Sequence, residues 1–396
     1  MTSNNEVWIT GIGLISSLGE GGDAHWQTLT SPSPAQPVIN SETTAPYSFH
    51  PLIEPDWATQ ISRRDKRQME PWMQIGSYAA GLALDDAGMK GDEELCSTMD
   101  MIVAAGGGER DIETDGAIHE DALHSSDPDT LLNERLSNDL RPTLFLAQLS
   151  NLLAGNISIV HKVTGSSRTF MGEESAGISA IQTAAARIAS GQSDHILVGG
   201  AYNSARPDMM LTFELGHYLW NKAPTGVAAR AKSGNGGIIL GSVGIFLVLE
   251  SRQHAEARGK TAYAKIDAVA ADHGSRSEGE AIKRGQALRN GLEVSSDIPT
   301  LSAATSIADI YGEEMQVLGD NSPIRCYGNQ FGHSVEAQFP LGIALAALAL
   351  SNNGFYPPFE QGEREAASSS DKILVSCFGH WRGEGLAVIS NHKAEG

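Results

Sequence analysis

The sequence has few cysteines and few basic residues. Three cysteines, Cys96, Cys326 and Cys377, occur in 396 residues, and none has the Cys-x-x-Cys spacing of a zinc or redox motif. This argues against a disulfide framework and a cysteine zinc site, and we expect no metal.

Lys and Arg number 28 against 48 Asp and Glu, a formal net charge of −20. Because phosphate binding needs a basic surface, nucleic acid is not an expected partner.

Long hydrophobic runs are also missing. The longest apolar run, "PLGIALAALAL" at 340–350, is too short to span a bilayer. The opening residues "MTSNNEVWITG" lack the basic and apolar regions of a signal peptide. These absences predict a cytoplasmic protein without a membrane span.

What is present is an alternation of strand-like runs and Ala-rich helical segments, which is typical of a layered α/β protein. The strand–bend–helix pattern at 166–190 resembles the one at 324–350, which predicts a duplicated unit.

Near the N-terminus, Gly11 and Gly13 match half of a dinucleotide-binding fingerprint. The alternative interpretation of the two glycines is a tight turn after a short strand.

The densest basic cluster of this acidic chain is "RRDKR" at 63–67, with Arg63, Arg64, Lys66 and Arg67. It precedes a segment of helical periodicity. Two interpretations remain open: a solvated start of a helix, or a docking patch for an acidic partner.

The stretch "TFMGEESAGISAI" at 169–181 predicts a bend that opens a helix, a place where enzymes position nucleophiles. The bend carries Glu173 and Glu174 and no cysteine. Ser175 has Gly177 two positions after it but Glu173 two positions before it, whereas a nucleophile elbow needs glycine on both sides. The pattern therefore argues against a serine hydrolase.

Several segments, taken in order, resemble the β-ketoacyl-acyl-carrier-protein synthases. They are "VWITGIGLISSLG", "SNLLAGNISIVHKVTG", "SAIQTAAARIASGQSDHILVGGAYN", "VGIFLVLESRQHAEARGKTAYAKI", "GHSVEAQFPLGIALAALALSNNGFYPP" and "SCFGHWRGEG". The resemblance covers nearly the whole chain. It implies an α/β thiolase fold of five layers, αβαβα, from two related αβα halves: an N-terminal synthase half at 1–252 and a C-terminal half at 253–396.

The resemblance also implies the activity of a 3-oxoacyl-acyl-carrier-protein synthase, an acyltransferase that needs no cofactor. In this family a cysteine at a helix N-terminus takes the acyl group, and two histidines stabilise the oxyanion of a malonyl thioester. Carried over to this chain, the cysteine position holds Glu174 and the first histidine position holds Ala303. The supporting lysine position holds Gly328, whereas His333 keeps the second histidine.

The family's Gly-rich C-terminal loop retains Phe378 and Gly379 and then changes to His380 and Trp381, which are expected to fill the acyl pocket. The expected partners are an acyl carrier protein, docked at the cluster 63–67, and a second synthase chain in a homodimer or heterodimer. The dimer interface is expected near 195–201.

Three functions follow from these departures. The first is a non-condensing, chain-length-factor-like partner of an active synthase in fatty acid biosynthesis, with the very-long-chain acyl groups of lipid A as one product class. The second is a malonyl-thioester decarboxylase or thioester hydrolase that uses Glu174 and His333. This alternative requires burial to raise the pKa of Glu174, since a charged carboxylate repels malonate. The third is a carrier-binding scaffold.

Overall fold

Two sets of five strands follow each other along the chain and have the same order in space. The computed structural model describes residues 5–31, 36–140, 146, 148–366 and 370–392. The first set comprises β1 (Val7–Ser16), β4 (Asp100–Ala105), β5 (Ser167–Met171), β6 (His195–Tyr202) and β8 (Val243–Ser251). The second set comprises β9 (Ala264–Asp272), β10 (Thr300–Ser302), β11 (Ile324–Cys326), β12 (Lys372–Phe378) and β13 (Glu384–Ser390).

The sheet runs in the order β11-β10-β12-β13-β9-β1-β8-β6-β4-β5. If the strands of each set are numbered by appearance, both sets have the order 3-2-4-5-1. A short antiparallel pairing joins the sets, where Val7–Ile9 of β1 lies beside Ala264–Ile266 of β9. The predicted duplication is confirmed at the level of topology, while the boundary between 252 and 253 remains a prediction.

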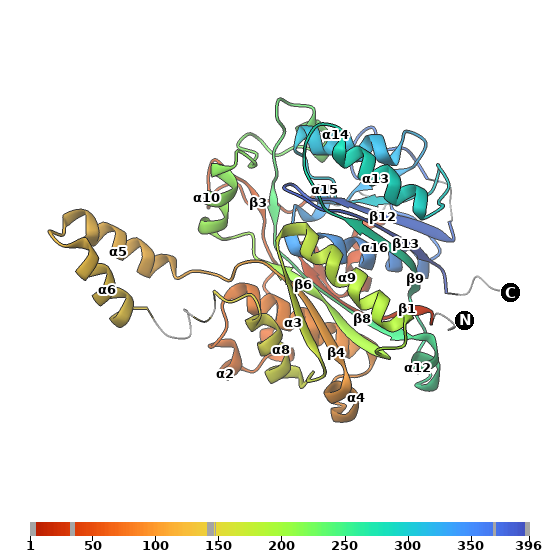
Figure 1. Cartoon of the computed structure of the whole chain (residues 1–396), viewed down its shortest axis with the longest axis horizontal. Coiled ribbons are helices and arrows are strands. Elements are labelled where there is room, and N and C mark those ends of the chain that lie inside the picture. The colour runs from red at the N-terminus through yellow and green to blue at the C-terminus, as the bar shows by residue number, and fades with distance from the viewer. Residues whose placement is uncertain (1–4, 32–35, 141–145, 147, 367–369, 393–396) are drawn as a thin grey trace.

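Helices complete five layers (Figure 1). The outer layers are α3 (Pro71–Ala87) with α8 (Leu152–His161), and α13 (Glu280–Gly291) with α14 (Ala308–Leu318). The middle layer consists of α9 (Glu173–Ala189) and α16 (Gln338–Ser351), and each contacts strands of both sets. The αβαβα architecture predicted from the resemblance is therefore confirmed.

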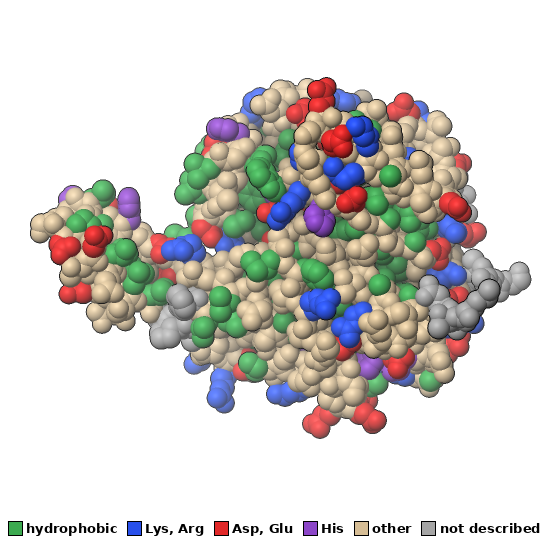
Figure 2. All heavy atoms as spheres, viewed as in Figure 1, with side chains coloured by type: hydrophobic (Ala, Val, Ile, Leu, Met, Phe, Trp, Pro, Cys, Tyr) green, Lys and Arg blue, Asp and Glu red, His purple; other side chains and the backbone are tan. Residues whose placement is uncertain are grey.

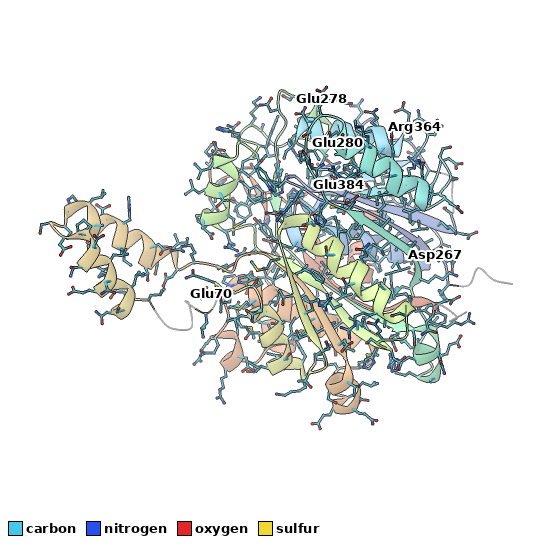
Figure 3. The ribbon with its side chains drawn as sticks, viewed as in Figure 1. Glu70, Asp267, Glu278, Glu280, Arg364 and Glu384 are labelled. Atoms are coloured by element: carbon cyan, nitrogen blue, oxygen red, sulfur yellow. The ribbon has the colours of Figure 1, made fainter. Side chains whose placement is uncertain are left out.

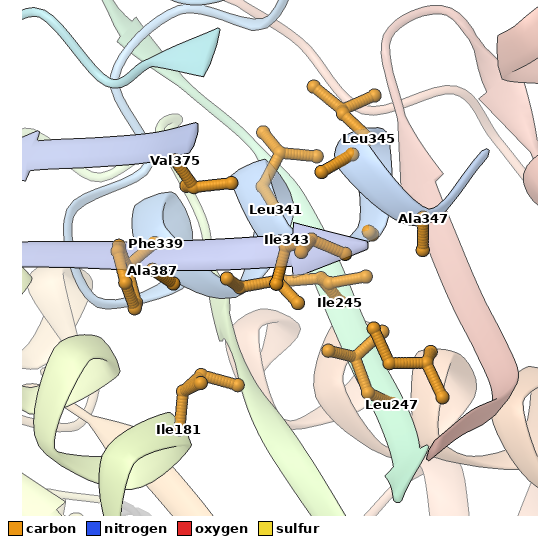
Figure 4. Packing of buried hydrophobic residues seen from close by; sticks show 14 of the residues in the cluster. Ile181, Ile245, Leu247, Phe339, Leu341, Ile343, Leu345, Ala347, Val375 and Ala387 are labelled. Carbon is orange, nitrogen blue, oxygen red and sulfur yellow. The ribbon is translucent and has the colours of Figure 1, made fainter. Parts of the chain in front are cut away.

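The middle layer explains the apolar run of the sequence. All side chains of α16 from Gln338 to Leu350 are buried, because sheet or helix surrounds the helix on every side. Figure 4 shows its apolar side chains packed between β8, which contributes Ile245 and Leu247, and β12, which contributes Val375.

Among the residues that the structure describes, no helix has the length and apolar character needed to cross a membrane. Residues 1–4, which entered the signal-peptide argument, lie outside the described residues.

Gly11 and Gly13 lie inside β1, so both the turn and the dinucleotide interpretations are wrong. A Cβ atom on Gly13 would lie 1.9 Å from the carbonyl oxygen of Ala79, and one on Gly11 would lie 2.5 Å from that of Ala83. The two glycines therefore let α3 pack directly against β1.

An arm projects from the body of the molecule (Figure 1). It consists of α5 (Ile112–His124) and α6 (Pro128–Asn138), which pack against each other. Asp111 and Asp127 cap the two helices by accepting the backbone N–H groups of residues 114 and 130. These two helices thus form an excursion on the surface of the molecule.

One free edge of the sheet is β5, whereas the strand at 195–201 is an inner strand. β6 lies between β4 and β8 and is buried throughout. Within the described residues β5 pairs only with β4, and Ser167, Arg168 and Met171 are exposed. The strand at 195–201 therefore offers no open edge for pairing, and the expectation that a dimer interface lies near it stays a prediction.

The remaining elements are short. They are β2 (Gly19–Glu20), α1 (Gly22–Leu29), β3 (Phe49–His50), a 3₁₀ turn (Trp57–Thr59), α2 (Arg63–Lys66), α4 (Glu93–Thr98), α10 (Pro207–Leu215), α11 (Val227–Ala231), β7 (Leu240–Gly241), α12 (Arg252–Ala257), α15 (Gly328–Phe331) and a second 3₁₀ turn (Val335–Ala337).

Candidate functional site

Glu174 lies in the first turn of α9, directly after a strained bend. Gly172 has φ 112° and Glu173 has φ 32°, a left-handed conformation that non-glycine residues rarely adopt. The bend predicted from "TFMGEESAG" is therefore confirmed. A helix N-terminus favours a negative charge, which suits a carboxylate at this place. The side chain of Glu174 is completely buried.

Two histidines from distant parts of the chain bind this carboxylate. His333 Nε2 lies 2.5 Å from Oε1 of Glu174, and His380 Nδ1 lies 2.9 Å from Oε1 and 3.0 Å from Oε2. Both imidazole rings are buried. The structure thus brings together three residues of the predicted site, with the carboxylate at their centre.

The pKa values of this cluster favour an ion pair. Burial opposes ionisation of Glu174, but the charge of His380 and the hydrogen bonds from both histidines outweigh it, so the pKa of Glu174 lies well below its ordinary value. Burial likewise lowers the pKa of His380, yet the Glu174 carboxylate more than compensates and raises that pKa above its ordinary value. Because an ionised carboxylate only accepts hydrogen bonds, His333 carries a proton on Nε2.

Aromatic rings and a groove surround His380. Its ring centroid lies 5.0 Å from that of Phe213 and 5.2 Å from that of Tyr218. A groove of about 950 Å³, lined by Tyr218, His380 and Trp381 together with α13 and α14, opens next to the cluster. His380 is buried beside Glu174, and its role in filling an acyl pocket stays a prediction. Trp381 fills no buried space, because it is 57% exposed at the rim of the groove.

Two arginines, Arg276 and Arg284, stabilise the loop that carries His380. Arg276 donates to the carbonyl oxygen of Gly379 at 2.6 Å and forms an ion pair with Glu384 at 2.7 Å. Glu384, at the start of β13 (Figure 3), also pairs with Arg284 at 2.8 Å. Sequence reasoning missed this network. The only signal was a lone glutamate opening an apolar strand, which does not identify its partners 100 or more positions away.

The loop itself lies directly on the start of α9. A Cβ atom on Gly379 would lie 3.0 Å from Oε2 of Glu174, and one on Gly383 would lie 2.7 Å from the Cβ atom of Ser175. Phe378, the last residue of β12, is buried. The predicted loop residues from 378 to 380 therefore adjoin the carboxylate site.

Ala303 and Gly328 are neighbours and contribute no titratable group. A Cβ atom on Gly328 would lie 3.6 Å from the carbonyl oxygen of Ala303. That oxygen accepts a hydrogen bond from Gln338 Nε2 at 3.3 Å, while Oε1 of Gln338 accepts the hydroxyl of Ser334 at 2.7 Å. Gln338, another residue that sequence reasoning missed, joins this region to the segment after His333.

Ser175 is not prepared for nucleophilic attack. Its hydroxyl donates to the carbonyl oxygen of Gly172 at 3.0 Å, and both nearby histidines bind Glu174 instead. A serine nucleophile needs a base within hydrogen-bond reach. The arrangement agrees with the sequence argument against a serine hydrolase.

The basic cluster at 63–67 lies apart from the site, on and just after α2. Arg63, Arg64 and Arg67 are exposed, and the ammonium group of Lys66 lies 4.5 Å from the ring centroid of Trp57. In the part of the chain that the structure describes, none of these four residues forms an ion pair with a carboxylate. Both interpretations of the cluster remain compatible with this geometry.

Comparison with known proteins agrees with this architecture. The family model described as "Beta-ketoacyl synthase, N-terminal domain" matches residues 4–255. The 3-oxoacyl-[acyl-carrier-protein] synthase 2 of Vibrio harveyi is 28% identical over 271 residues, which are 67% of this chain and 62% of that protein. The chain thus spans less than two thirds of the length of this relative.

Solved structures share the fold. A β-ketoacyl synthase from Burkholderia phymatum superimposes with a TM-score of 0.80 at 18% identity, over 98% of this chain and 100% of the other. The ishigamide ketosynthase/chain length factor superimposes with a TM-score of 0.78 at 19% identity, again over 98% and 100%. Because the family model matches more than half of the chain, the protein belongs to the β-ketoacyl synthase family.

Proposed function

We propose that this chain is a non-condensing subunit of fatty acid biosynthesis, which pairs with an active β-ketoacyl synthase and shapes its acyl pocket as a chain-length factor does. One observation carries the proposal: Glu174, at the position that the resemblance gives to the nucleophile, binds the chain's own His333 and His380. The donor that would stabilise a substrate oxyanion is thereby engaged within the protein. A carboxylate there is also a poor acyl acceptor, because the resulting mixed anhydride is readily hydrolysed.

The low pKa of Glu174 weighs against the alternative of a malonyl-thioester decarboxylase. That reaction would need a neutral Glu174 so that the malonyl carboxylate is not repelled. The two histidines instead hold the side chain ionised. Hydrolysis by Glu174 as a general base is equally disfavoured, since a low pKa makes a weak base.

Exposed apolar residues support a partner chain. They lie on the arm, at Leu123, Leu132 and Leu136, and on α10, at Leu211 and Leu215, and they are between 40% and 75% exposed. Figure 2 shows apolar side chains on both elements. We call these residues, together with the open edge of β5, the arm face. Exposed apolar residues of this kind are typical of an interface.

The acyl carrier protein is the expected second partner. The curated relative named above takes its substrates on such a carrier, as its name states. Arg63, Arg64 and Arg67 would offer an acidic carrier three solvated positive charges on an otherwise acidic chain.

Co-expression tests the pairing. The untagged chain would be produced with tagged candidate synthases, and co-purification and the chain length of the acyl product would be measured. We expect a stable complex and a shifted product length. Leu132→Gln combined with Leu136→Gln should weaken the complex at least tenfold, whereas Val38→Gln, an exposed apolar residue outside the arm face, should not. A chain that binds no synthase and changes no product would refute the proposal.

A further inference from the structure

Glu174, His333 and His380 also have the composition of a metal site. One carboxylate oxygen and two imidazole nitrogens lie within 4.8 Å of one another. We propose that these three side chains bind one divalent transition-metal ion, and that Zn²⁺ is the ion they favour. Cysteine spacings, from which no metal is expected, do not reveal this site, because His333 and His380 lie 159 and 206 positions from Glu174.

The geometry requires only a small adjustment. Ligand bonds of about 2.0–2.2 Å in a tetrahedral site place ligand atoms roughly 3.3 Å apart. The contacts of the two histidine nitrogens with Oε1 of Glu174 are now 2.5 and 2.9 Å. An ion would therefore replace the shared protons and move each histidine nitrogen away from Oε1 of Glu174 by less than about 1 Å.

The donor types select the metal. Two imidazoles and one carboxylate suit Zn²⁺ and its first-row neighbours, while Mg²⁺ and Ca²⁺ prefer all-oxygen sites. Three protein ligands of this kind leave a fourth position for water. Of the three ligands His380 also lines the groove, so an ion would approach the cluster from the side of His380.

A second donor set in the chain provides a comparison. Cys326, Glu360 and Glu363 also offer ligand atoms within 4.8 Å of one another. Burial raises the pKa of the Cys326 thiol well above its ordinary value, and nearby carboxylates add to the shift. Since a thiol binds metal only as thiolate, this set is the weaker candidate.

Titration calorimetry and cobalt spectroscopy test the site. The untagged chain would be stripped with a chelator and titrated with Zn²⁺, and the absorption of the Co²⁺ form would be recorded. We expect about one ion per chain and visible bands of a four-coordinate Co²⁺ ion. Glu174→Gln and His380→Gln should each weaken binding at least tenfold.

Two controls are matched to these variants. His254→Gln removes another histidine that binds a buried carboxylate, that of Glu250 at 2.6 Å, and Cys326→Ser removes the competing thiol. Neither should change the affinity. The proposal is overturned if the wild-type chain takes up no ion, or if Cys326→Ser abolishes binding while the two site variants retain it.

X-ray absorption of the Zn²⁺-loaded wild-type chain keeps the test decisive if a variant does not fold. We expect nitrogen and oxygen scatterers with the multiple-scattering pattern of two imidazoles. A sulfur scatterer would contradict the site. Because these measurements use the chain alone, their failure is distinguishable from a failure of the proposed pairing with a synthase.

Discussion

The Nδ1 atom of His380 lies 2.9 Å from Oε1 of Glu174, although 206 positions separate the two residues. This contact joins the C-terminal loop to the first turn of a middle-layer helix. It also gives the buried carboxylate a positively charged neighbour. The bend after β5 and the loop after β12 are therefore held together by a direct side-chain contact.

Glu174→Ala should destabilise the protein strongly. The substitution leaves the buried N–H groups of His333 and His380 without an acceptor, and breaking a buried ion pair costs about 3–5 kcal/mol. Equilibrium denaturation with urea measures the loss. Ser175→Ala is the neighbouring control and should cost less than about 1.5 kcal/mol, because it removes one hydrogen bond to a backbone carbonyl. Equal losses in the two variants would contradict the central role of Glu174.

The contribution of His380 to stability should decrease as pH rises. Its pKa is higher in the folded protein than the ordinary 6.5, so the contribution is complete below pH 6.5 and is lost as pH rises through the raised value. The contribution of Glu174 is complete above its ordinary pKa of 4.5 and is lost only in stronger acid. The free energy of unfolding would be measured for the wild type and for His380→Gln from about pH 5 to pH 9. The difference between the two values should decrease as pH rises.

His161 provides a control of opposite sign for this experiment. Burial lowers the pKa of its imidazole to about 4. The difference between wild type and His161→Gln should therefore grow as pH rises from 4 toward 6.5 and then remain constant. A difference for His380 that is flat, or that follows the same direction as His161, would show that Glu174 does not raise the pKa of His380.

Much of the fold was predictable because its signals are local. The apolar helix at 338–351 and the bend before Glu174 follow from residue type and spacing within a few turns of chain. Gly11 and Gly13 were misread because their role depends on α3, which begins about 60 positions later. A glycine pattern alone does not distinguish a turn from a close helix–strand contact.

The site was predictable only where the resemblance supplied positions. It pointed to Glu174 and His333, yet their mutual hydrogen bond was not foreseen. The roles of His380 as ion-pair partner and of Arg276 as loop anchor depend on tertiary contacts between segments more than 100 positions apart. No local pattern encodes such contacts.

Gly383→Ala should disturb the loop. Gly383 has φ 91°, which is unfavourable for alanine, and the new Cβ atom would lie 2.7 Å from that of Ser175. We expect a loss of about 1–3 kcal/mol in the free energy of unfolding. In the control variant Gly107→Ala, the added Cβ atom meets no other atom within 4 Å. This variant should change the free energy of unfolding by less than about 0.5 kcal/mol. A tolerated Gly383→Ala would mean that the loop does not rest on α9.

Charge reversal of the basic cluster should weaken carrier binding. Arg63→Glu combined with Arg64→Glu removes two solvated charges and adds two that repel an acidic carrier. Binding of acyl carrier protein to the complex, measured at low and high salt, should fall at least tenfold at low salt and less at high salt. Lys283→Glu, a charge reversal at another exposed site, should have little effect. If both variants bind equally well, the cluster is only a solvated start of a helix.

Glu174→Cys should create the fastest-reacting thiol of the chain. The introduced side chain would lie at a helix N-terminus beside the imidazole of His380. The helix terminus lowers a thiol pKa, and a neighbouring imidazole can accept the thiol proton, so both features favour the nucleophilic thiolate. The three natural cysteines are buried, and burial raises the pKa of each thiol. Iodoacetamide labelling followed by peptide mass spectrometry should therefore modify position 174 at least tenfold faster than Cys96, Cys326 or Cys377. Condensation should still not appear, since Ala303 offers no donor and the loss of one oxyanion donor alone costs about 10²–10³ in rate. Labelling no faster than at the natural cysteines would show that the groove beside His380 gives no access to the start of α9.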